Sequence, residues 1–295
     1  MRCFKYLVVA AMIFCVALTS CQKNDVNPMK LLEIISLKER ELFDEFEIEY
    51  AEDKYEFEYD RRNRITGYAG YRYLDYNAAG DLVEHNLRYS MSRNPWSKTT
   101  FSRKGNKINF ITTYYHPLGT LSGNVTGELE LNAQGLPVKL TSENEQTQGM
   151  DCLQRNVWSY TVTLTWQNGN LIKVNWKRES ESDRKCWWEE ESKSEKSSNT
   201  GTVNYTHDDN KTPFYHCNTP KWALWWFNYC SWNGYNENYQ GNNYGDNKNN
   251  IKTETREDGK TITYEYTYDN DGFPATRVWV SGTNTYMETY TYKHE

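Results

Sequence analysis

The residues best suited to binding chemistry in this chain are aromatic. Four tryptophans fall within eleven positions, namely Trp222, Trp225, Trp226 and Trp232, and an Asn-rich tract at 233–250 follows them. Aromatic rings stack on the apolar face of a sugar, and amide groups hydrogen-bond to its hydroxyl rim. The cluster therefore predicts a platform for a glycan or a peptide. The alternative interpretation is that these rings fill the hollow side of a β-sheet as core.

Four cysteines in the body of the chain predict disulfides. They are Cys152, Cys186, Cys217 and Cys230. An even number in an exported protein indicates a disulfide framework, and four cysteines allow three connectivities. We expect Cys152–Cys186 and Cys217–Cys230, because each pair closes a local loop. A metal site is the rival interpretation, but no pair has the two-residue spacing of a zinc knuckle, so we expect no metal.

A further cysteine, Cys21, ends a secretory signal. Arg2 and Lys5 come first, an apolar run follows from Tyr6 to Leu18, and the small residue Ser20 precedes the cysteine. This order resembles the lipobox of bacterial lipoproteins. The resemblance implies cleavage before Cys21, a diacylglyceryl group on its thiol and a fatty acyl chain such as palmitate on the new amino terminus. Several acyl chains hold a protein stably in a bilayer, whereas a single chain gives only marginal binding. The alternative is an ordinary signal peptide with a chance cysteine.

The signal fixes the expected organisation of the chain. We expect a signal peptide at 1–20, a lipidated tether at 21–30 and a single antiparallel β domain at 31–295. The protein would be lipid-anchored in the outer membrane, facing either the periplasm or the cell surface. Removal of the signal leaves 32 basic against 40 acidic residues, a net charge of −8. That balance lacks the basic footprint of a nucleic-acid-binding protein and does not favour docking on anionic lipid headgroups.

Sequence patterns that carry catalysis are absent. The chain holds no Gly-x-Ser-x-Gly, no His-Glu-x-x-His and no phosphate-binding loop. His207, Asp208 and Asp209 could form an acid–base or metal cluster, but such a trio is more typical of a polar turn. Glu56 and Glu58 share one strand face, as a glycosidase pair could, although a solvated face is the more ordinary reading. We expect no enzyme activity and no cofactor.

Strands are the elements expected to position these residues. Apolar and polar residues alternate with a period of two at 55–59, 162–166 and 264–268. One apolar and one polar face is typical of an antiparallel sheet that is solvated on one side. The apolar spacing of 31–43 suits either a helix or a strand, and we expect a strand because the rest of the chain alternates.

Turns of one kind separate these strands. Asp or Asn stands three residues ahead of Gly or Asn in turns that begin at Asp60, Asn77, Asn132 and Asp269. The leading side chain of such a type I turn hydrogen-bonds to its own backbone, and Gly or Asn tolerates the positive φ that closes it. Looser copies lie around Gly105 and Gly169. Strands joined by tight turns lie side by side, so the sequence predicts an all-β meander: one large, curved, water-soluble antiparallel sheet shaped as a half-barrel.

Two segments depart from this pattern. Residues 179–199 are rich in Ser, Glu and Lys, and we expect a long hairpin loop there. Residues 207–250 contain the tryptophans and the Asn-rich tract. We expect this second segment to be one long aromatic loop insertion, because loops of such length usually serve a function or are disordered.

Three features together resemble a known family. They are the lipobox at Cys21, the Tyr-x-Tyr-Asp turns such as 266–269, and the Asp-Asn-Lys-x-Pro-Phe-like segment at 209–214 ahead of the last β unit at 262–274. The chain resembles a family of lipoproteins of unknown function from gut Gram-negative anaerobes, described as having a porin-like fold. The likeness spans most of the mature chain and is strongest from 205 to 293. It implies a broad, strongly curved antiparallel sheet and carries over no catalytic residue.

Porin-like shape need not mean a membrane-spanning barrel. A spanning barrel needs an outward apolar band on every strand, and charged residues such as Glu56, Glu58 and Arg62 crowd several strands. We therefore expect a water-soluble domain behind the lipid anchor.

Two functions follow from these observations. The first is a non-enzymatic binding lipoprotein whose curved sheet or aromatic loop holds a glycan or a protein partner. The second is a structural or chaperone-like lipoprotein that holds lipid or an outer-membrane client. A closed apolar cavity lined by Val162, Leu164, Ile172 and Val174 would favour lipid. Solvent exposure of the tryptophans between 222 and 232 would favour a glycan.

Overall fold

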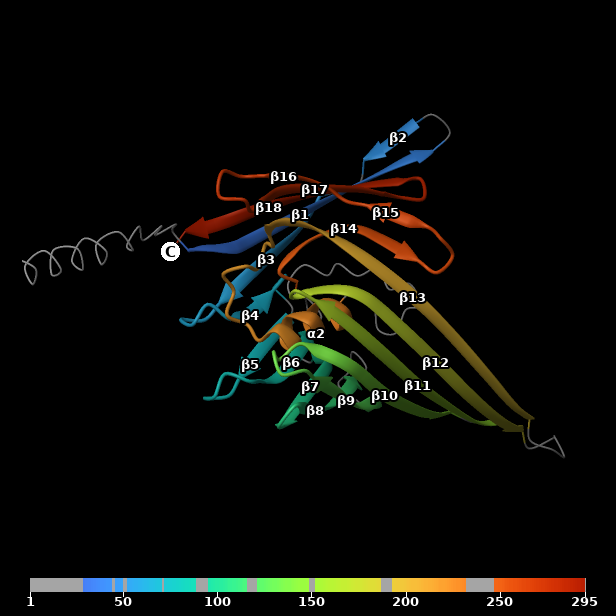
Figure 1. Cartoon of the computed structure of the whole chain (residues 1–295). Helices are drawn as coiled ribbons and strands as arrows, with labels where there is room; N and C mark the ends of the chain where they lie inside the picture. The colour runs from blue at the N-terminus through green and yellow to red at the C-terminus, as the bar shows by residue number, and fades with distance from the viewer. Residues whose placement is uncertain are drawn as a thin grey trace, which may run out of the picture.

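The structure is a computed structural model. It describes residues 29–43, 46–49, 52–70, 72–88, 95–115, 121–148, 152–186, 193–231 and 247–294. These residues hold eighteen strands and one helix (Figure 1). The elements are β1 (Lys30–Phe43), β2 (Phe46–Glu49), β3 (Asp53–Tyr59), β4 (Ile65–Tyr68), β5 (Arg72–Tyr76), β6 (Leu82–Arg88), β7 (Pro95–Lys104), β8 (Lys107–Tyr115), β9 (Leu121–Leu131), β10 (Pro137–Gln148), β11 (Cys152–Gln167), β12 (Asn170–Cys186), β13 (Lys193–Lys211), α2 (Lys221–Ser231), β14 (Asn249–Arg256), β15 (Thr261–Thr263), β16 (Glu265–Tyr268), β17 (Pro274–Ser281) and β18 (Asn284–His294). The all-β prediction is confirmed, and the first strand begins at Lys30, inside the span expected to be tether.

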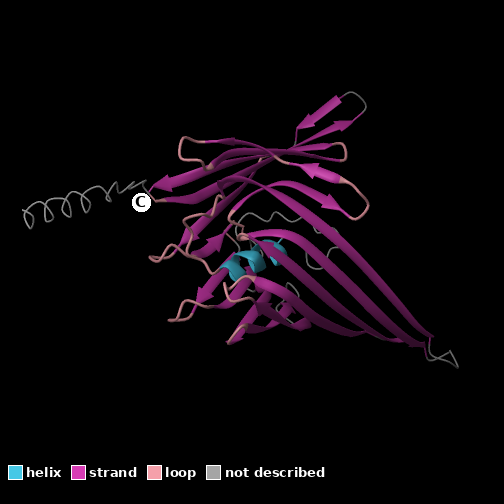
Figure 2. Ribbon diagram, viewed as in Figure 1, coloured by secondary structure: helices cyan, strands magenta, loops and turns pink. Residues whose placement is uncertain are grey.

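The strands form a nearly closed barrel. Neighbours in sequence pair antiparallel from β3 through β15 and from β16 through β18. Strand β1 closes the sheet, since it pairs with β18 on one side and with β2 and β3 on the other. Only Tyr264 separates β15 from β16, and these two short strands pair with β14 and β17 respectively. The meander therefore goes further around than a half-barrel, as Figure 2 shows.

The four Asp or Asn turns have the geometry that their sequences predict. In the turn at Asp269, the Oδ1 atom accepts the backbone N–H groups of Asp271 and Phe273 at 2.9 and 3.0 Å. Asp60, Asn77 and Asn132 use their side-chain oxygens in the same way. The closing residues have positive φ values of 60°, 95°, 76° and 78°, at Asn63, Gly80, Gly135 and Gly272.

Because neighbouring strands are antiparallel, successive connections between them lie at opposite ends of the barrel. All four turns lie at one end, called here the turn end, together with the strand termini at Lys30 and His294. At the opposite end β10 to β13 continue past the barrel as a four-stranded projection, called here the fin. It comprises residues 143–148, 152–160, 176–186 and 193–202 and forms the long sheet at the lower right of Figure 1.

The hairpin loop expected at 179–199 is wrong, because strands β12 and β13 occupy its described residues. The pairing of β12 with β13 extends outward to Arg184 and Lys193. The pairing of β13 with β14 ends nearer the barrel, at Val203 and Arg256. Main-chain hydrogen bonds hold the fin together without a core. Its sequence therefore lacks the alternation of apolar and polar residues that marks a half-buried strand.

The loop insertion expected at 207–250 is also corrected. Strand β13 extends through Lys211, α2 occupies Lys221–Ser231, and β14 begins at Asn249. Residues 232–246 lie outside the described part of the chain. Six consecutive residues of α2, from Trp222 to Phe227, are buried. A helix that is apolar on every side must be surrounded by other structure, and the strands surround α2 as a plug in the barrel (Figure 2). Among the described residues, no helix has both the length and the apolar character needed to cross a membrane.

Candidate functional site

Three of the four tryptophans proposed as a ligand platform are core. Trp222, Trp225 and Trp226 are 2%, 0% and 3% exposed. The ring centroid of Trp226 lies 5.1 Å from that of Phe101 and 4.6 Å from that of Phe110, with the rings at 90° and 61°. The platform prediction is therefore wrong for these three, because the helix presents them to the barrel wall and not to water. Trp232 lies outside the described residues.

The wall of the barrel is shaped around the plug. Phe227 makes an edge contact with Tyr68 on β4, and Trp222 makes one with Phe101 on β7. A Cβ atom at Gly127 on β9 would lie 2.4 Å from the Phe110 ring, so only glycine lets that ring lie across the strand. Val162, Leu164 and Val174 face the same interior and are buried, whereas Ile172 is half-exposed. The apolar interior thus holds α2.

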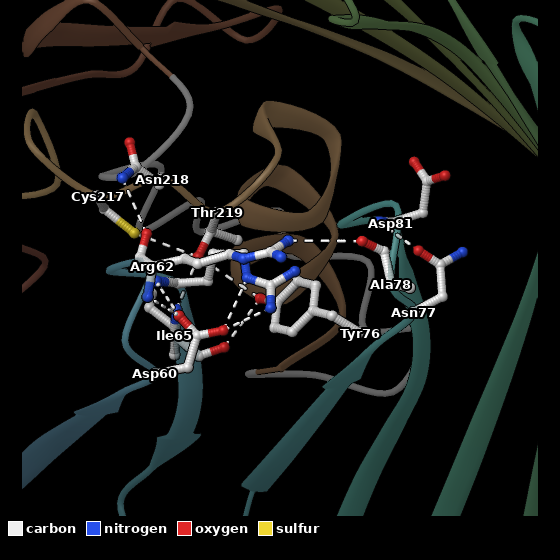
Figure 3. Close-up of polar contacts among 11 residues, drawn as sticks. Asp60, Arg62, Ile65, Tyr76, Asn77, Ala78, Asp81, Cys217, Asn218 and Thr219 are labelled. Carbon is white, nitrogen blue, oxygen red and sulfur yellow. Dashed lines mark hydrogen bonds and ion pairs between the residues drawn. The ribbon is translucent and has the colours of Figure 1, made fainter.

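A hydrogen-bonded lock fixes the start of the plug to the wall (Figure 3). The Oγ1 atom of Thr219 accepts the backbone N–H of Ile65 at 2.8 Å and the thiol of Cys217 at 3.2 Å. The Tyr76 hydroxyl donates to the carbonyl of Ile65 at 2.8 Å. Burial raises the pKa of the Cys217 thiol, which favours the protonated form over the reactive thiolate. These contacts suit anchoring of the helix and not catalysis.

An ion pair lies beside the lock. Arg64 donates from Nε to Asp60 Oδ2 at 2.8 Å, and its guanidinium carbon lies 4.3 Å from the Tyr76 ring centroid. Burial pushes the pKa of Asp60 upward, but the hydrogen bonds and charge of Arg64 outweigh it and hold that pKa below its usual range. The carboxylate therefore stays ionised, in a structural role at the β3–β4 turn.

The Cys217–Cys230 disulfide is not formed, because Cys217 carries a free thiol. Cys217 precedes α2, whereas Cys230 lies in its last turn, about 14 Å along the helix axis from Lys221 at 1.5 Å per residue. A disulfide needs Cα atoms within about 7 Å. Cys152 and Cys186, by contrast, are directly opposed in the β11–β12 register, and Cys186 is fully buried. Their disulfide stays a prediction with suitable backbone placement.

A second buried group lies on β17 and β18. Arg277 and Glu288 are register partners, with Nε 3.0 Å from Oε2, and their side chains are 2% and 3% exposed. Tyr290 donates its hydroxyl to the same Glu288 oxygen at 2.6 Å. Burial raises the pKa of Glu288, although the attraction of Arg277 acts against that rise. The guanidinium carbon of Arg277 also lies 4.4 Å from the Trp279 ring centroid. With Tyr290 and Arg277 in contact, the carboxylate is part of the packed interior.

His207, Asp208 and Asp209 lie within strand β13, where its pairing with β14 is irregular, and not in the polar turn that the sequence favours. Asp208 Oδ1 accepts the backbone N–H groups of Asn210 and Asn250 at 2.9 and 3.1 Å, and Oδ2 accepts the Tyr268 hydroxyl. Burial lowers the pKa of His207 to about 4, which leaves its imidazole neutral. Within the described ranges, no three His, Cys, Asp or Glu side chains are placed to hold a metal ion.

The inner face of the fin combines aromatic and amide side chains. Val162 and Val174 point into the barrel, so alternate residues along β11 and β12 continue that face outward. Its described side chains include three aromatic residues and five amides, namely Trp158, Tyr160, Trp176, Asn144, Gln146, Gln154, Asn156 and Asn199. Among the described side chains of this face, the charged ones are Arg178, Arg184 and Glu195.

The outer face of the fin has the opposite character. Among its described positions it carries no amide and no aromatic side chain, but nine charges: Glu143, Glu145, Arg155, Lys177, Glu179, Glu181, Asp183, Lys185 and Lys196. Ion pairs cross it, such as Arg155 to Glu145 at 2.7 Å. The two faces contact the same solvent, so solubility alone does not explain why only the inner face is aromatic and rich in amides.

Several inner-face groups are already oriented. Tyr160 and Trp176 pack against the core at the base of the fin, where a Cβ atom on Gly201 would lie 2.5 Å from the Trp176 ring. Gln154 donates to Asn156 Oδ1 at 3.2 Å. The buried Oδ1 of Asn144 has no hydrogen-bond partner among the described residues. The two amides Gln154 and Asn156, two positions apart on either side of Arg155, were the signal that could have located this face from the sequence.

The solved structures to which this chain is similar include two porin-like proteins, both of low similarity. A porin-like protein from Bacteroides uniformis is 14% identical, with 89% of this chain and 96% of that chain covered and a TM-score of 0.30. A porin-like protein from Bacteroides vulgatus is 12% identical, with coverages of 87% and 97% and a TM-score of 0.31. Similarity at this level carries no function from them to this chain. No protein-family model matches the sequence, and no curated protein matches it.

Proposed function

We propose that this protein is a lipid-anchored, non-enzymatic glycan-binding protein of the outer membrane, with its binding surface on the inner face of the fin. The observation that carries the proposal is the contrast between the two faces of that sheet. Neutral amides and aromatic rings gather on the inner face, and charges gather on the outer one.

The chemistry of the inner face matches that of a sugar. Trp158 and Trp176 are half-buried, on register pairs four positions apart, and offer rings on which a sugar can stack. Asn144 and Gln146 follow on β10, and each amide both donates and accepts hydrogen bonds, as a sugar hydroxyl does. A sheet of fixed register holds these groups in place before binding, which lowers the ordering entropy that binding must offset.

Binding of a protein partner is the second candidate. Among the described strands, none pairs with the outer edge of β13 from Lys193 to Thr202. An open edge can accept a strand from another protein. Lys196 and its neighbours are polar and exposed, however, and such residues also protect an edge from unwanted pairing. Storage of lipid in the lumen is not favoured, because α2 fills the apolar interior.

The glycan proposal is tested by substitution on the two faces of the fin. Soluble polysaccharides are screened by intrinsic fluorescence and by calorimetry. Trp158→Ala should weaken binding at least about fivefold, because stacking of a nucleobase on one aromatic ring contributes about 1–3 kcal/mol and we expect a similar value for a sugar ring. Asn156→Ala, two positions away on the same face, should weaken it less.

Two outer-face variants are the matched controls. Ser159→Ala and Lys177→Ala alter the neighbours of Trp158 and Trp176 on the opposite face, and affinity should be unchanged. The proposal fails if no polysaccharide of the screen binds, or if the outer-face variants weaken binding as much as Trp158→Ala. A cross-link from the edge of β13 to a discrete protein would support the second candidate instead.

The anchor is tested separately. Cys21→Ala should leave the precursor uncut or release the protein from the membrane fraction, because no acyl chain can then be attached. Cell fractionation and radiolabelled palmitate provide the measurement. If the variant still carries label and floats with membranes, Cys21 is not the site of lipidation.

A further inference from the structure

The turn end of the barrel is strongly basic in an acidic protein. Its segments contain eleven Lys and Arg residues against five Asp residues, although the chain as a whole has a net charge of −6. The segments counted are residues 30, 60–64, 77–81, 103–107, 132–136, 167–170, 209–221, 247–248, 269–273 and 293–294. The fold thus places these basic residues together at one end of the barrel.

Ion pairs neutralise the acids of this end and leave a surplus of cations. Lys30 pairs with Asp269 at 2.8 Å and also with Asp271, Arg103 pairs with Asp81 at 2.7 Å, and Arg64 pairs with Asp60. Only Asp209 is left among the five. Six basic residues form no ion pair with any described residue: Arg61, Arg62, Lys104, Lys211, Lys248 and Lys293. Four of these six, Arg61, Arg62, Lys104 and Lys248, are exposed to solvent.

The basic segments lie together in space. Asn218 donates its backbone N–H to the carbonyl of Asn63 at 2.9 Å, and Lys248 donates to the carbonyl of Gly169 at 3.0 Å. Lys211 donates to the carbonyl of Gly272 at 3.2 Å. These bonds tie turns from distant parts of the sequence into one surface.

Exposed apolar side chains accompany the charge. Met29 and Tyr215 are 40% and 49% exposed, and the Lys211 ammonium lies 5.6 Å from the Tyr215 ring centroid. A tyrosine beside basic residues suits the boundary between headgroups and water, where an aromatic ring has an apolar body and a polar tip.

The chain enters the barrel at this same end. Met29 lies eight residues after Cys21, so a fully extended tether spans at most about 28 Å. The fin points the other way, and the seventeen residues of β12 alone measure about 55 Å at 3.3 Å per residue. An anchor at Cys21 therefore keeps the turn end near the bilayer and directs the fin away from it.

We infer that the turn end is a docking surface for anionic phospholipid headgroups. It holds the barrel upright on the membrane and presents the inner face of the fin outward. The inference rests on the lipid anchor proposed above for the orientation, while the attraction itself depends only on the exposed cations. Each Lys or Arg near an anionic surface adds about 1 kcal/mol of attraction, so even a few unpaired cations give measurable binding.

The test uses the mature chain, residues 21–295, with Cys21→Ser so that no acyl chain contributes. The probes are vesicles of phosphatidylcholine with and without phosphatidylglycerol, and the readout is co-sedimentation. The chain should bind only the anionic vesicles and should dissociate at high salt. The variant Arg61→Ser/Arg62→Ser/Lys104→Ser should lower the partition coefficient at least about tenfold.

A control variant separates position from net charge. The variant Lys177→Ser/Lys185→Ser/Lys196→Ser also loses three positive charges, but from the outer face of the fin. It should bind the anionic vesicles as the parent does. Equal loss in both variants, or no preference for anionic vesicles, overturns the inference. The vesicle test uses a chain without an acyl group, so its result does not depend on whether Cys21 is lipidated. A failure of lipidation in cells would therefore not change the vesicle result, and a failure of vesicle binding would not change the Cys21 result.

Discussion

Trp226→Ala should lower the free energy of unfolding by about 3–5 kcal/mol, the range for removal of a buried tryptophan side chain. The ring is 3% exposed and packs edge-on against Phe101 and Phe110. The wall around it is a hydrogen-bonded barrel that cannot collapse freely into the space left behind. Urea unfolding followed by far-ultraviolet circular dichroism measures the shift in midpoint, with an unchanged slope indicating a change in stability alone.

Trp96→Ala is the control for this experiment. Its side chain is 46% exposed, so its truncation should cost far less. Acrylamide should quench Trp96 fluorescence and leave that of the plug tryptophans nearly untouched. A stable Trp226→Ala variant with a midpoint near that of the parent, or quenching of Trp225 and Trp226 in the folded protein, would contradict the assignment of α2 as a plug.

Arg277→Met should destabilise the barrel by about 3–5 kcal/mol, because it leaves Glu288 as a buried carboxylate without its cation. The cost should fall as the pH falls. Burial already raises the pKa of Glu288, and removal of Arg277 raises that pKa further. The folded state then takes up a proton more readily than the unfolded state, so the variant gains stability relative to the parent as the pH drops through that pKa.

The double variant Arg277→Met/Glu288→Leu distinguishes loss of pairing from loss of packing. It removes both charges and should recover most of the stability lost in Arg277→Met, since apolar residues often replace a buried ion pair without cost. Urea midpoints at neutral and mildly acidic pH provide the measurement. If the double variant is as unstable as the single one at both pH values, the side-chain volume of Arg277 matters and the charge pair does not.

Prediction from the sequence was strongest where local rules decide the structure. The turns at Asp60, Asn77, Asn132 and Asp269 follow from a side chain that bonds to its own backbone and a residue that accepts positive φ. Alternation at 162–166 and 264–268 is likewise a local property of half-buried strands. The opposition of Cys152 and Cys186 could also be predicted, because the first and last residues of a regular hairpin lie opposite each other.

Prediction failed where the surroundings of a segment decide its role. Residues 179–199 have no alternation because the fin has no core, and their composition therefore predicts a loop where the structure has two strands. A cluster of tryptophans looks the same in a sequence whether it binds a sugar or fills a barrel. Only their position inside the nearly closed sheet makes Trp222, Trp225 and Trp226 core. The Cys217–Cys230 pairing failed because most of the residues between them form a helix, which carries the backbone of Cys230 away from the residues ahead of α2.

The sequence by itself determined the all-β class and the places where the chain turns, and it predicts a secretory signal that ends at Cys21. These depend on residues near one another in the chain, through backbone preferences and the period of the strands. Only the tertiary structure decided that the sheet nearly closes, that α2 fills it, and that the amides and aromatic rings of the fin share one face. It alone also gathered the unpaired cations at the turn end, because these properties depend on register and closure, which bring distant residues together.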